Sequence, residues 1–177
     1  MAAAACGPAD PDRVAAESYD SFWLWAGVRE QPVLAKARTL YLLDGEIRAG
    51  EPGRYSALRP GVPRLPGKTV WLVVRTDTLD WPAAAAAGLE ARLDRWAAAG
   101  NRVEGLQVDF DAGTRSLGRY AGFLRALRRG LPRRYRLSIT GLMDWSANGD
   151  PAALAGLAGV VDEVVVQTYQ GRATIPG

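Results

Sequence analysis

Three polar side chains alternate along the end of a segment that otherwise looks like a buried β-strand. The segment covers residues 103–110, and Gln107, Asp109 and Asp111 occupy every second position at its end. Because side chains alternate along a strand, these three share one face, while apolar residues occupy the other. Two carboxylates close together in a partly dry site repel each other. One is therefore expected to be protonated near neutral pH, as a general acid must be.

The same carboxylate pair also has a structural interpretation. Asp111 could cap the helix that follows, and Asp109 could pair with an arginine such as Arg75. We favour the functional interpretation, because burying two acids and a glutamine on one strand face costs free energy unless the groups are used.

Further polar and aromatic side chains are expected at the same ends of neighbouring strands. Gln167 and Tyr169 share a face of the strand predicted at residues 164–169, and Tyr169 could donate a hydrogen bond to a substrate oxygen. Asp144 and Trp145 follow the preceding strand. Acids after the second and third strands make this rim acidic: Asp44, Glu46 and Asp77. Aromatic faces suit sugar rings, although a tyrosine or tryptophan at such a position can also simply be core.

The elements that carry these residues alternate between strands and helices. Apolar β-type runs are predicted at residues 22–28, 39–43, 69–76, 103–110, 137–142 and 164–169. Asp80 is predicted to cap the first long helix, and Asp150 with Pro151 to begin the last one. Residues 50–67 are rich in proline and glycine and should form a loop. Such alternation predicts a parallel sheet with right-handed crossovers.

Two architectures fit this pattern, a doubly wound open sheet and part of a (β/α)8 barrel. A dinucleotide-type Gly-x-Gly-x-x-Gly does not follow the first strand, and a complete barrel takes about 250 residues, whereas the chain has 177. We predict an α/β fold, a partial TIM-type (β/α)8 barrel of about six parallel strands with helices, truncated after strand six. Residues 1–20 would be a flexible tether, and 21–177 the barrel domain, incomplete at its C-terminus. Its open sheet edges would favour oligomers.

Composition excludes several kinds of site. The chain is 48% hydrophobic and 23% charged, which is typical of a globular domain. It has no histidine and one cysteine, Cys6, so a disulfide framework, a Cys/His zinc site and a His-activated nucleophile are excluded. We expect no metal and no cofactor. Arginines gather between residues 115 and 136, at the end of the barrel opposite the rim, where a solvated face is favoured over a nucleic-acid or anionic-envelope surface.

The first residues resemble a bacterial lipoprotein cleavage box, because small residues directly precede the lone Cys6. The charged and apolar regions of a signal peptide are absent from the sequence given. We slightly favour an exported protein lipidated at Cys6 over a cytoplasmic chain with an alanine-rich start. No uncharged apolar run of about 18 residues is present, so contact with a membrane is expected only through that lipid.

Residues 106–111, 137–146 and 164–172 resemble an uncharacterised bacterial family, catalogued as domain-of-unknown-function family 3142. Residues 41–47 and 70–81 also fit, so the resemblance covers nearly everything after the tether. Family members are longer than this chain, and many look like exported lipoproteins, which adds weight to lipidation at Cys6. The resemblance implies no activity.

A more distant resemblance is to the chitinase-like barrels of glycoside hydrolase family 18. Their fourth strand ends Asp-Gly-apolar-Asp-x-Asp-x-Glu, and Glu104, Gln107, Asp109 and Asp111 occupy these four polar positions. The resemblance makes Asp109 the acid that orients the substrate and places Asp111 where the family has its catalytic Glu. Tyr169 matches the tyrosine of the Met-x-Tyr on their sixth strand. Aspartate is shorter than glutamate, and a misplacement of roughly 1 Å can cost on the order of 100-fold in rate, so chitinase activity does not carry over.

Together these features predict a glycoside-hydrolase-like barrel protein that acts on or binds a glycan at the bacterial cell envelope. Asp111 would be the general acid, and Asp109 would orient the substrate or stabilise developing positive charge. The expected substrate contacts are Gln107, Tyr169, Gln167, Asp144 and Trp145. The alternative is a non-catalytic envelope lipoprotein that binds a glycan or acts as a scaffold. We expect no nucleic-acid partner, and the sequence leaves open whether turnover occurs.

Overall fold

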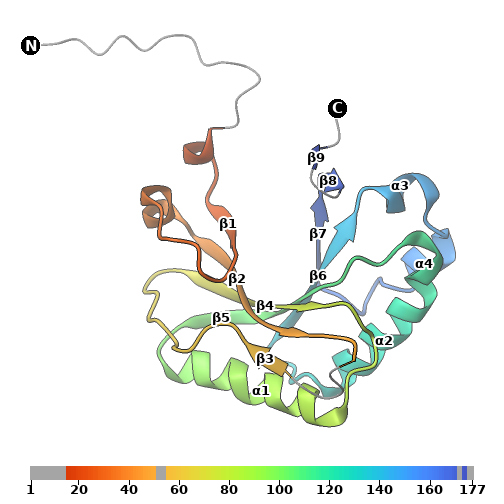
Figure 1. Cartoon of the computed structure of the whole chain (residues 1–177), viewed down its shortest axis with the longest axis horizontal. Helices are drawn as coiled ribbons and strands as arrows, with labels where there is room; N and C mark the ends of the chain where they lie inside the picture. The colour runs from red at the N-terminus through yellow and green to blue at the C-terminus, as the bar shows by residue number, and fades with distance from the viewer. Residues whose placement is uncertain (1–14, 51–54, 171–172, 175–177) are drawn as a thin grey trace, which may run out of the picture.

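Parallel strands form one curved sheet with the shape of a half barrel (Figure 1). The computed structural model describes residues 15–50, 55–170 and 173–174. The six parallel strands follow one another in the order β1 (Ser21–Leu24), β2 (Thr39–Ile47), β4 (Thr69–Thr76), β5 (Arg102–Asp109), β6 (Arg136–Leu142) and β7 (Glu163–Gln167). Sequential order with parallel pairing is the arrangement of a (β/α) barrel, so the predicted fold class is confirmed.

Short antiparallel strands complete the β structure. The predicted loop at residues 50–67 contains β3 (Tyr55–Ala57), which pairs antiparallel with β2. After β7, β8 (Tyr169–Gln170) pairs antiparallel with β9 (Ala173–Thr174). Among the described residues β1 pairs only with β2 and β7 only with β6, so both are edge strands. The predictions of an incomplete barrel, of oligomers and of a tether at residues 1–20 stay predictions.

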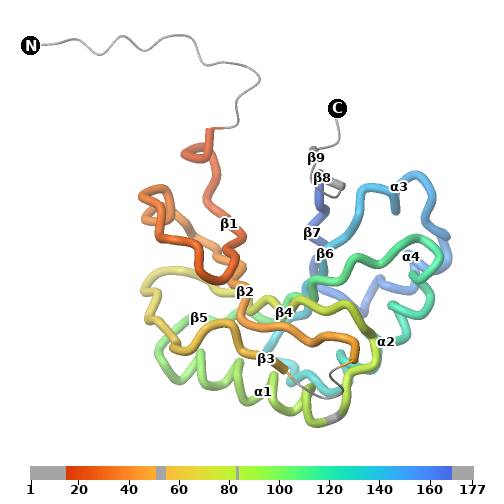
Figure 2. The backbone as a smooth tube through the Cα atoms, viewed as in Figure 1, coloured from red at the N-terminus to blue at the C-terminus, as the bar shows by residue number. Residues whose placement is uncertain are grey.

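Helices cover the convex side of the sheet and leave its concave side open (Figures 1 and 2). They are α1 (Ala83–Ala98), α2 (Leu117–Gly130), α3 (Asp144–Asn148) and α4 (Pro151–Ala155), with 3-10 turns at Ala16–Ser18, Pro32–Lys36 and Thr114–Ser116. Helix α1 lies between β4 and β5 in the chain, α2 lies between β5 and β6, and the short α3 and α4 precede β7. In the described residues no helix is long and apolar enough to cross a membrane.

The hydrophobic core lies between the outer face of the sheet and these helices. Leu89, Leu93 and Trp96 recur at helical spacing on α1 and are buried. From the sheet, alternate residues such as Leu106 and Val108 of β5 are buried in the same cluster. Each such side chain contributes about 1.5–3 kcal/mol when it is fully removed from water. The outer face of the sheet therefore supplies the packing free energy, and the inner face is available for polar groups.

Of the two predicted helix starts, one is wrong and one is confirmed. Asp80 does not cap α1, because the helix begins later at Ala83, and Asp80 pairs with Arg119 at 3.1 Å. Asp150 does cap α4, where its carboxylate accepts a hydrogen bond of 3.1 Å from the N–H of Ala152.

The second strand is longer than predicted. It continues to Ile47 through an irregularity in register between Leu43 and Gly45. Asp44 is therefore buried rather than at the rim, and Nε of Arg92 on α1 lies 2.6 Å from its Oδ2. The predicted rim is consequently less acidic than the sequence suggested.

Candidate functional site

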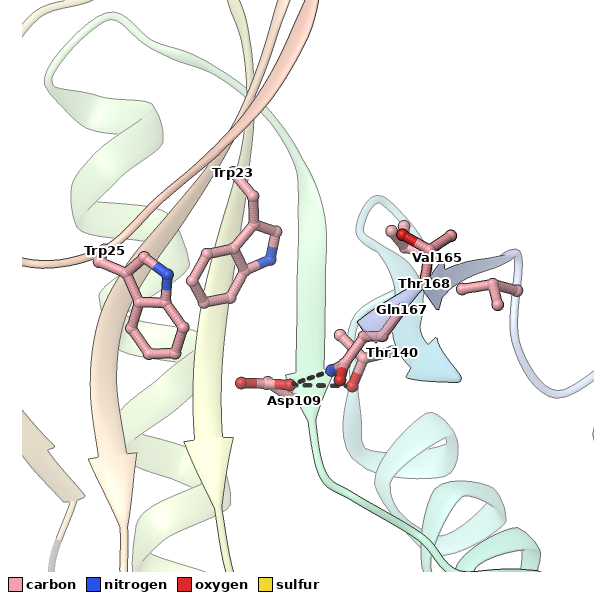
Figure 3. Close-up of a pocket in the computed structure, with 8 residues that line it drawn as sticks. Trp23, Trp25, Asp109, Thr140, Val165, Gln167 and Thr168 are labelled. Atoms are coloured by element: carbon pink, nitrogen blue, oxygen red, sulfur yellow. Dashed lines mark hydrogen bonds between the residues drawn. The ribbon is translucent and has the colours of Figure 1, made fainter. Parts of the chain in front are cut away.

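The strand register brings side chains from four strands together at the carboxyl ends of the sheet. Arg75 of β4 lies directly opposite Asp109 of β5, which is the last residue of its strand. Thr140 of β6 and Gln167 of β7 reach the same position from the other side (Figure 3). Active sites of (β/α) barrels are built at this end of the strands.

Asp109 is buried and held by hydrogen bonds from two neighbouring strands. Its Oδ1 accepts a hydrogen bond of 2.9 Å from Thr140 Oγ1 and one of 3.3 Å from Gln167 Nε2 (Figure 3). Burial raises the pKa of the Asp109 carboxyl above its usual range, and the nearby charge of Asp111 adds to this rise. The hydrogen bond from Thr140 and the positive charge of Arg75 lower that pKa, but the net direction is upward. Burial of this kind shifts the protonation equilibrium of a carboxyl group toward its neutral form.

Asp111 lies beside Asp109 in a different environment. Its side chain is 60% exposed, and its Oδ2 lies 3.9 Å from Nη2 of Arg75. The other terminal nitrogen of Arg75, Nη1, lies 3.6 Å from Oδ2 of Asp109. The structure thus brings the two predicted carboxylates together at one guanidinium group. The suggested contact between Asp109 and Arg75 is present, whereas the next helix, α2, receives no side-chain cap from Asp111.

A pocket of about 250 Å³ opens in front of Asp109. The residues that line it are Trp23, Trp25, Asp109, Thr140, Val165, Val166, Gln167 and Thr168. The two indoles lie on one side of Asp109, and Thr140 with Gln167 lie on the other (Figure 3). The ring centres of Trp23 and Trp25 are 4.7 Å apart in an edge-to-face arrangement, and Trp25 is 42% exposed. The pocket therefore combines exposed aromatic surface with a buried acid.

Gln107 belongs to the support of the pocket rather than to its surface. It is fully buried, and its Oε1 accepts a hydrogen bond of 2.7 Å from the indole Nε1 of Trp23. Its Nε2 donates a hydrogen bond of 3.0 Å to Ser138 Oγ. With both ends of the amide occupied, Gln107 orients Trp23, and the expected direct contact with a substrate is not supported.

Asp144 and Trp145 do not line the pocket either. After β6 the chain turns at once into α3, which carries Trp145 into the core at 6% exposure. The Trp145 indole Nε1 donates a hydrogen bond of 2.7 Å to the carbonyl oxygen of Ala112. Asp144 is exposed and accepts a hydrogen bond from Asn148 one turn later on the same helix. The sequence interpretation missed this short helix, which carries Trp145 into the core, and neither residue is on the pocket lining.

Two predicted residues cannot be placed. Cys6 lies outside the described residues, and of Tyr169 only the backbone, in β8, is described. Among the side chains that are described, no group of three or more metal-ligating residues occurs. The expectations of lipidation at Cys6, of no metal and of no cofactor stay predictions.

The sequence analysis named Arg75 only as a possible ion-pair partner of Asp109, and it did not select Thr140. Arg75 and Thr140 lie on concave faces of their strands near the carboxyl ends, as strand alternation would have indicated. Trp23 lies on the first strand and Trp25 directly after it, and neither is among the predicted substrate contacts. Their position next to Asp109 depends on the curvature of the sheet, which no local pattern specifies.

The family assignment follows from comparison with known proteins. A family model described as Domain of unknown function (DUF3142) matches residues 67–174. The chain belongs to this family. The matched part of this DUF3142 protein includes Arg75, Asp109, Asp111 and Gln167, whereas Trp23 and Trp25 lie before it. No curated protein matched in sequence.

Two solved structures share the fold of this DUF3142 protein. The spore cortex-lytic enzyme SleL of Bacillus cereus superposes with a TM-score of 0.56 at 16% identity, over 84% of this chain and 41% of its own. The chitinase domain of the spore coat protein CotE from Clostridium difficile gives a TM-score of 0.53 at 10% identity, over 84% of this chain and 49% of its own. The chain thus spans less than half the length of either. At these identities the similarity establishes the fold alone, a barrel like that of glycoside hydrolases.

Proposed function

We propose that this DUF3142 protein binds a glycan in the pocket formed by Trp23, Trp25 and Asp109, as a glycoside-hydrolase-like protein of the bacterial cell envelope. The observation that carries the proposal is the position of Asp109. A buried carboxyl with a raised pKa lies at the carboxyl ends of parallel strands, next to exposed indole surface. Barrel enzymes place their chemistry at this position.

The pocket supplies the two kinds of contact that a sugar ring needs. The C–H groups of a pyranose ring pack against an aromatic face, and Trp25 offers such a surface. Sugar hydroxyl groups both donate and accept hydrogen bonds, and Asp109, Gln167 and Thr168 lie on the lining. Ligand pockets typically combine an apolar lining with a few polar groups in this way.

If the site is catalytic, the environments of the two acids suggest which one donates the proton. Asp109 is 5% exposed and its pKa is raised, which is the direction that a general acid needs. Asp111 is largely solvated and would supply negative charge beside the developing positive charge on the sugar. This assignment reverses the roles that the sequence resemblance suggested.

The two proteins of similar structure support a glycan as the ligand class. One is a cortex-lytic enzyme and the other a chitinase domain, so both belong to proteins that act on polysaccharides.

Binding is tested by isothermal titration calorimetry with chitin oligosaccharides and soluble peptidoglycan fragments as probes. Trp25→Ala should weaken binding about tenfold, which corresponds to a loss of ~1.4 kcal/mol of binding free energy. Asp20→Asn is a matched control, because Asp20 is an exposed acid at the opposite end of β1. Equal affinity of wild type and Trp25→Ala, or binding of neither probe, would contradict the proposal.

Turnover is tested on the same probes by the release of reducing ends. Loss of release in Asp109→Asn with binding retained would make Asp109 the acid. Loss only in Asp111→Asn would restore the roles inferred from the sequence. Binding without release in wild-type protein would favour the alternative, a non-catalytic envelope protein. The envelope proposal itself is tested by the intact mass of the native protein, where lipid on Cys6 is the expected result.

A further inference from the structure

We infer that Arg75 is the positioning residue of this site, and that it holds Asp109 and Asp111 side by side at the mouth of the pocket. The inference rests on the proposed function only in treating the pocket as a ligand site. The arrangement of the three side chains, and the experiment that tests it, involve no glycan.

The contact geometry places one guanidinium group between two carboxylates. Nη1 of Arg75 lies 3.6 Å from Oδ2 of Asp109, and Nη2 lies 3.9 Å from Oδ2 of Asp111. The β4–β5 register pairs Arg75 with Asp109, so the backbone fixes this approach. Asp111 lies two residues after Asp109, just beyond the end of the strand, so its side chain is on the same side of the backbone as that of Asp109.

The oxygen of Asp109 that faces Arg75 is the one that other strands leave unused. Both Thr140 and Gln167 donate to Oδ1, and within the described residues no hydrogen bond reaches Oδ2. The two ion-pair distances to Arg75 exceed ordinary hydrogen-bond lengths. A ligand oxygen or a water molecule could therefore bridge the guanidinium and the carboxylates. Arg75 would then contact the ligand as well as position the acids.

Trp25 holds Arg75 in place. The guanidinium carbon of Arg75 lies 5.3 Å from the centre of the Trp25 ring, within the range of a cation–π contact. The Arg75 side chain is 43% exposed, so it remains reachable from the pocket mouth. Trp25 thus both lines the pocket and supports the cation that organises its acids.

The effect of Arg75 on the two acids depends on which other charged groups surround Asp109. The groups that face Asp109 are Arg75 from β4, Asp111 after β5, Thr140 from β6, Gln167 from β7 and Tyr120 from α2. Of these, Arg75 alone is a cation. Without it, two carboxylates would face each other with no counter-charge, and the exposed Asp111 would turn toward water.

The test is an NMR titration of the aspartate side-chain carboxyl groups in the glycan-free protein. Arg75→Gln should raise the pKa of Asp109 further, because a lowering charge is lost while the raising effect of burial stays. Arg75→Lys should restore part of that shift, since the charge is kept. Arg38→Gln is the control, because Arg38 is an exposed arginine that precedes β2, at the opposite end of the sheet.

Arg75→Met preserves the length of the side chain and replaces Arg75→Gln if that variant does not fold. Unchanged titration of Asp109 in a folded Arg75→Gln or Arg75→Met protein would overturn the inference, as would an absence of rescue by lysine. Failure of every glycan to bind would refute the proposed function and leave this titration result standing. The two proposals can therefore fail separately.

Discussion

The indole Nε1 of Trp23 on β1 donates a hydrogen bond of 2.7 Å to Oε1 of Gln107 on β5. Gln107 donates in turn to Ser138 on β6, and Ser138 donates to Oε2 of Glu163 on β7 at 2.7 Å. Tyr41 on β2 donates to the other oxygen of Glu163 at 2.9 Å. One chain of hydrogen bonds thus links five strands across the concave side of the sheet. Each side chain in this chain of hydrogen bonds is bonded to the next, so the side chains orient one another.

Gln107→Ala should lower the free energy of unfolding by about 2–4 kcal/mol, since it leaves a cavity and removes the partners of Trp23 and Ser138. Gln31→Ala is the control, because Gln31 is exposed and its side chain donates a long hydrogen bond of 3.4 Å to the carbonyl oxygen of Arg29. Urea unfolding measures both variants. Equal effects at the two positions would show that the chain of hydrogen bonds contributes little.

Arg92→Met should be among the most destabilising single changes in α1. Asp44 is 1% exposed and its carboxylate is paired with Arg92, so the variant leaves a buried charge that keeps the hydrogen bond from the Tyr55 hydroxyl but loses its ion-pair partner. Breaking such a pair costs about 3–5 kcal/mol. Arg95→Met, on the exposed side of the same helix, should have little effect on thermal or urea unfolding. Similar losses in the two variants would contradict the structural role of the pair.

The stability difference between wild type and Asp109→Asn should depend on pH. The pKa of Asp109 is raised in the folded protein, so the folded chain keeps this proton when the unfolded chain has lost it. The stabilisation that the group provides is complete below the ordinary aspartate pKa of about 3.9, and it is lost as pH rises through the folded pKa. Asparagine does not titrate.

The free energy of unfolding should be measured with urea at several pH values from acid to neutral. The difference in favour of wild type over Asp109→Asn should be largest at the acid end. Asp20→Asn, measured in parallel, accounts for the change in net charge. A difference that stays constant with pH would mean that Asp109 titrates as a solvated carboxyl, and it would remove the basis for a proton donor at this position.

Gly105→Ala should disrupt the pairing of β5 with β6. A methyl group on Gly105 would meet the backbone oxygen of Arg136 at 2.0 Å, which rigid strand backbones cannot accommodate. On α2, Gly122 has open space around it, and Gly122→Ala should stabilise the protein by about 0.5–1 kcal/mol through helix propensity. Thermal melting of the two variants should therefore shift in opposite directions. A Gly105→Ala protein as stable as wild type would show that the strands are less closely paired than described.

Local patterns in the sequence determined most of the element order. Apolar runs predicted the strands because a parallel strand that is buried on both faces is rich in Val and Leu, as residues 69–76 are. Helical spacing of Leu89, Leu93 and Trp96 predicted α1 for the same reason, since its inward face must be apolar. Alternation also placed Asp109 on the polar concave face. These inferences succeeded because each depends on the spacing of apolar and polar residues, which can be read directly from the sequence.

Only the tertiary structure decided which of the predicted residues form the site. Gln107, Asp109 and Asp111 are equivalent in the sequence pattern, yet Gln107 is enclosed by Trp23 and Ser138, Asp109 is buried, and Asp111 is exposed. Burial and partners depend on how far neighbouring strands extend and how the sheet curves, and these depend on contacts between residues distant in the chain. Trp23 reaches Gln107 across 84 residues for this reason. The sequence alone determined the face on which the acids lie, and the curved sheet determined their environments.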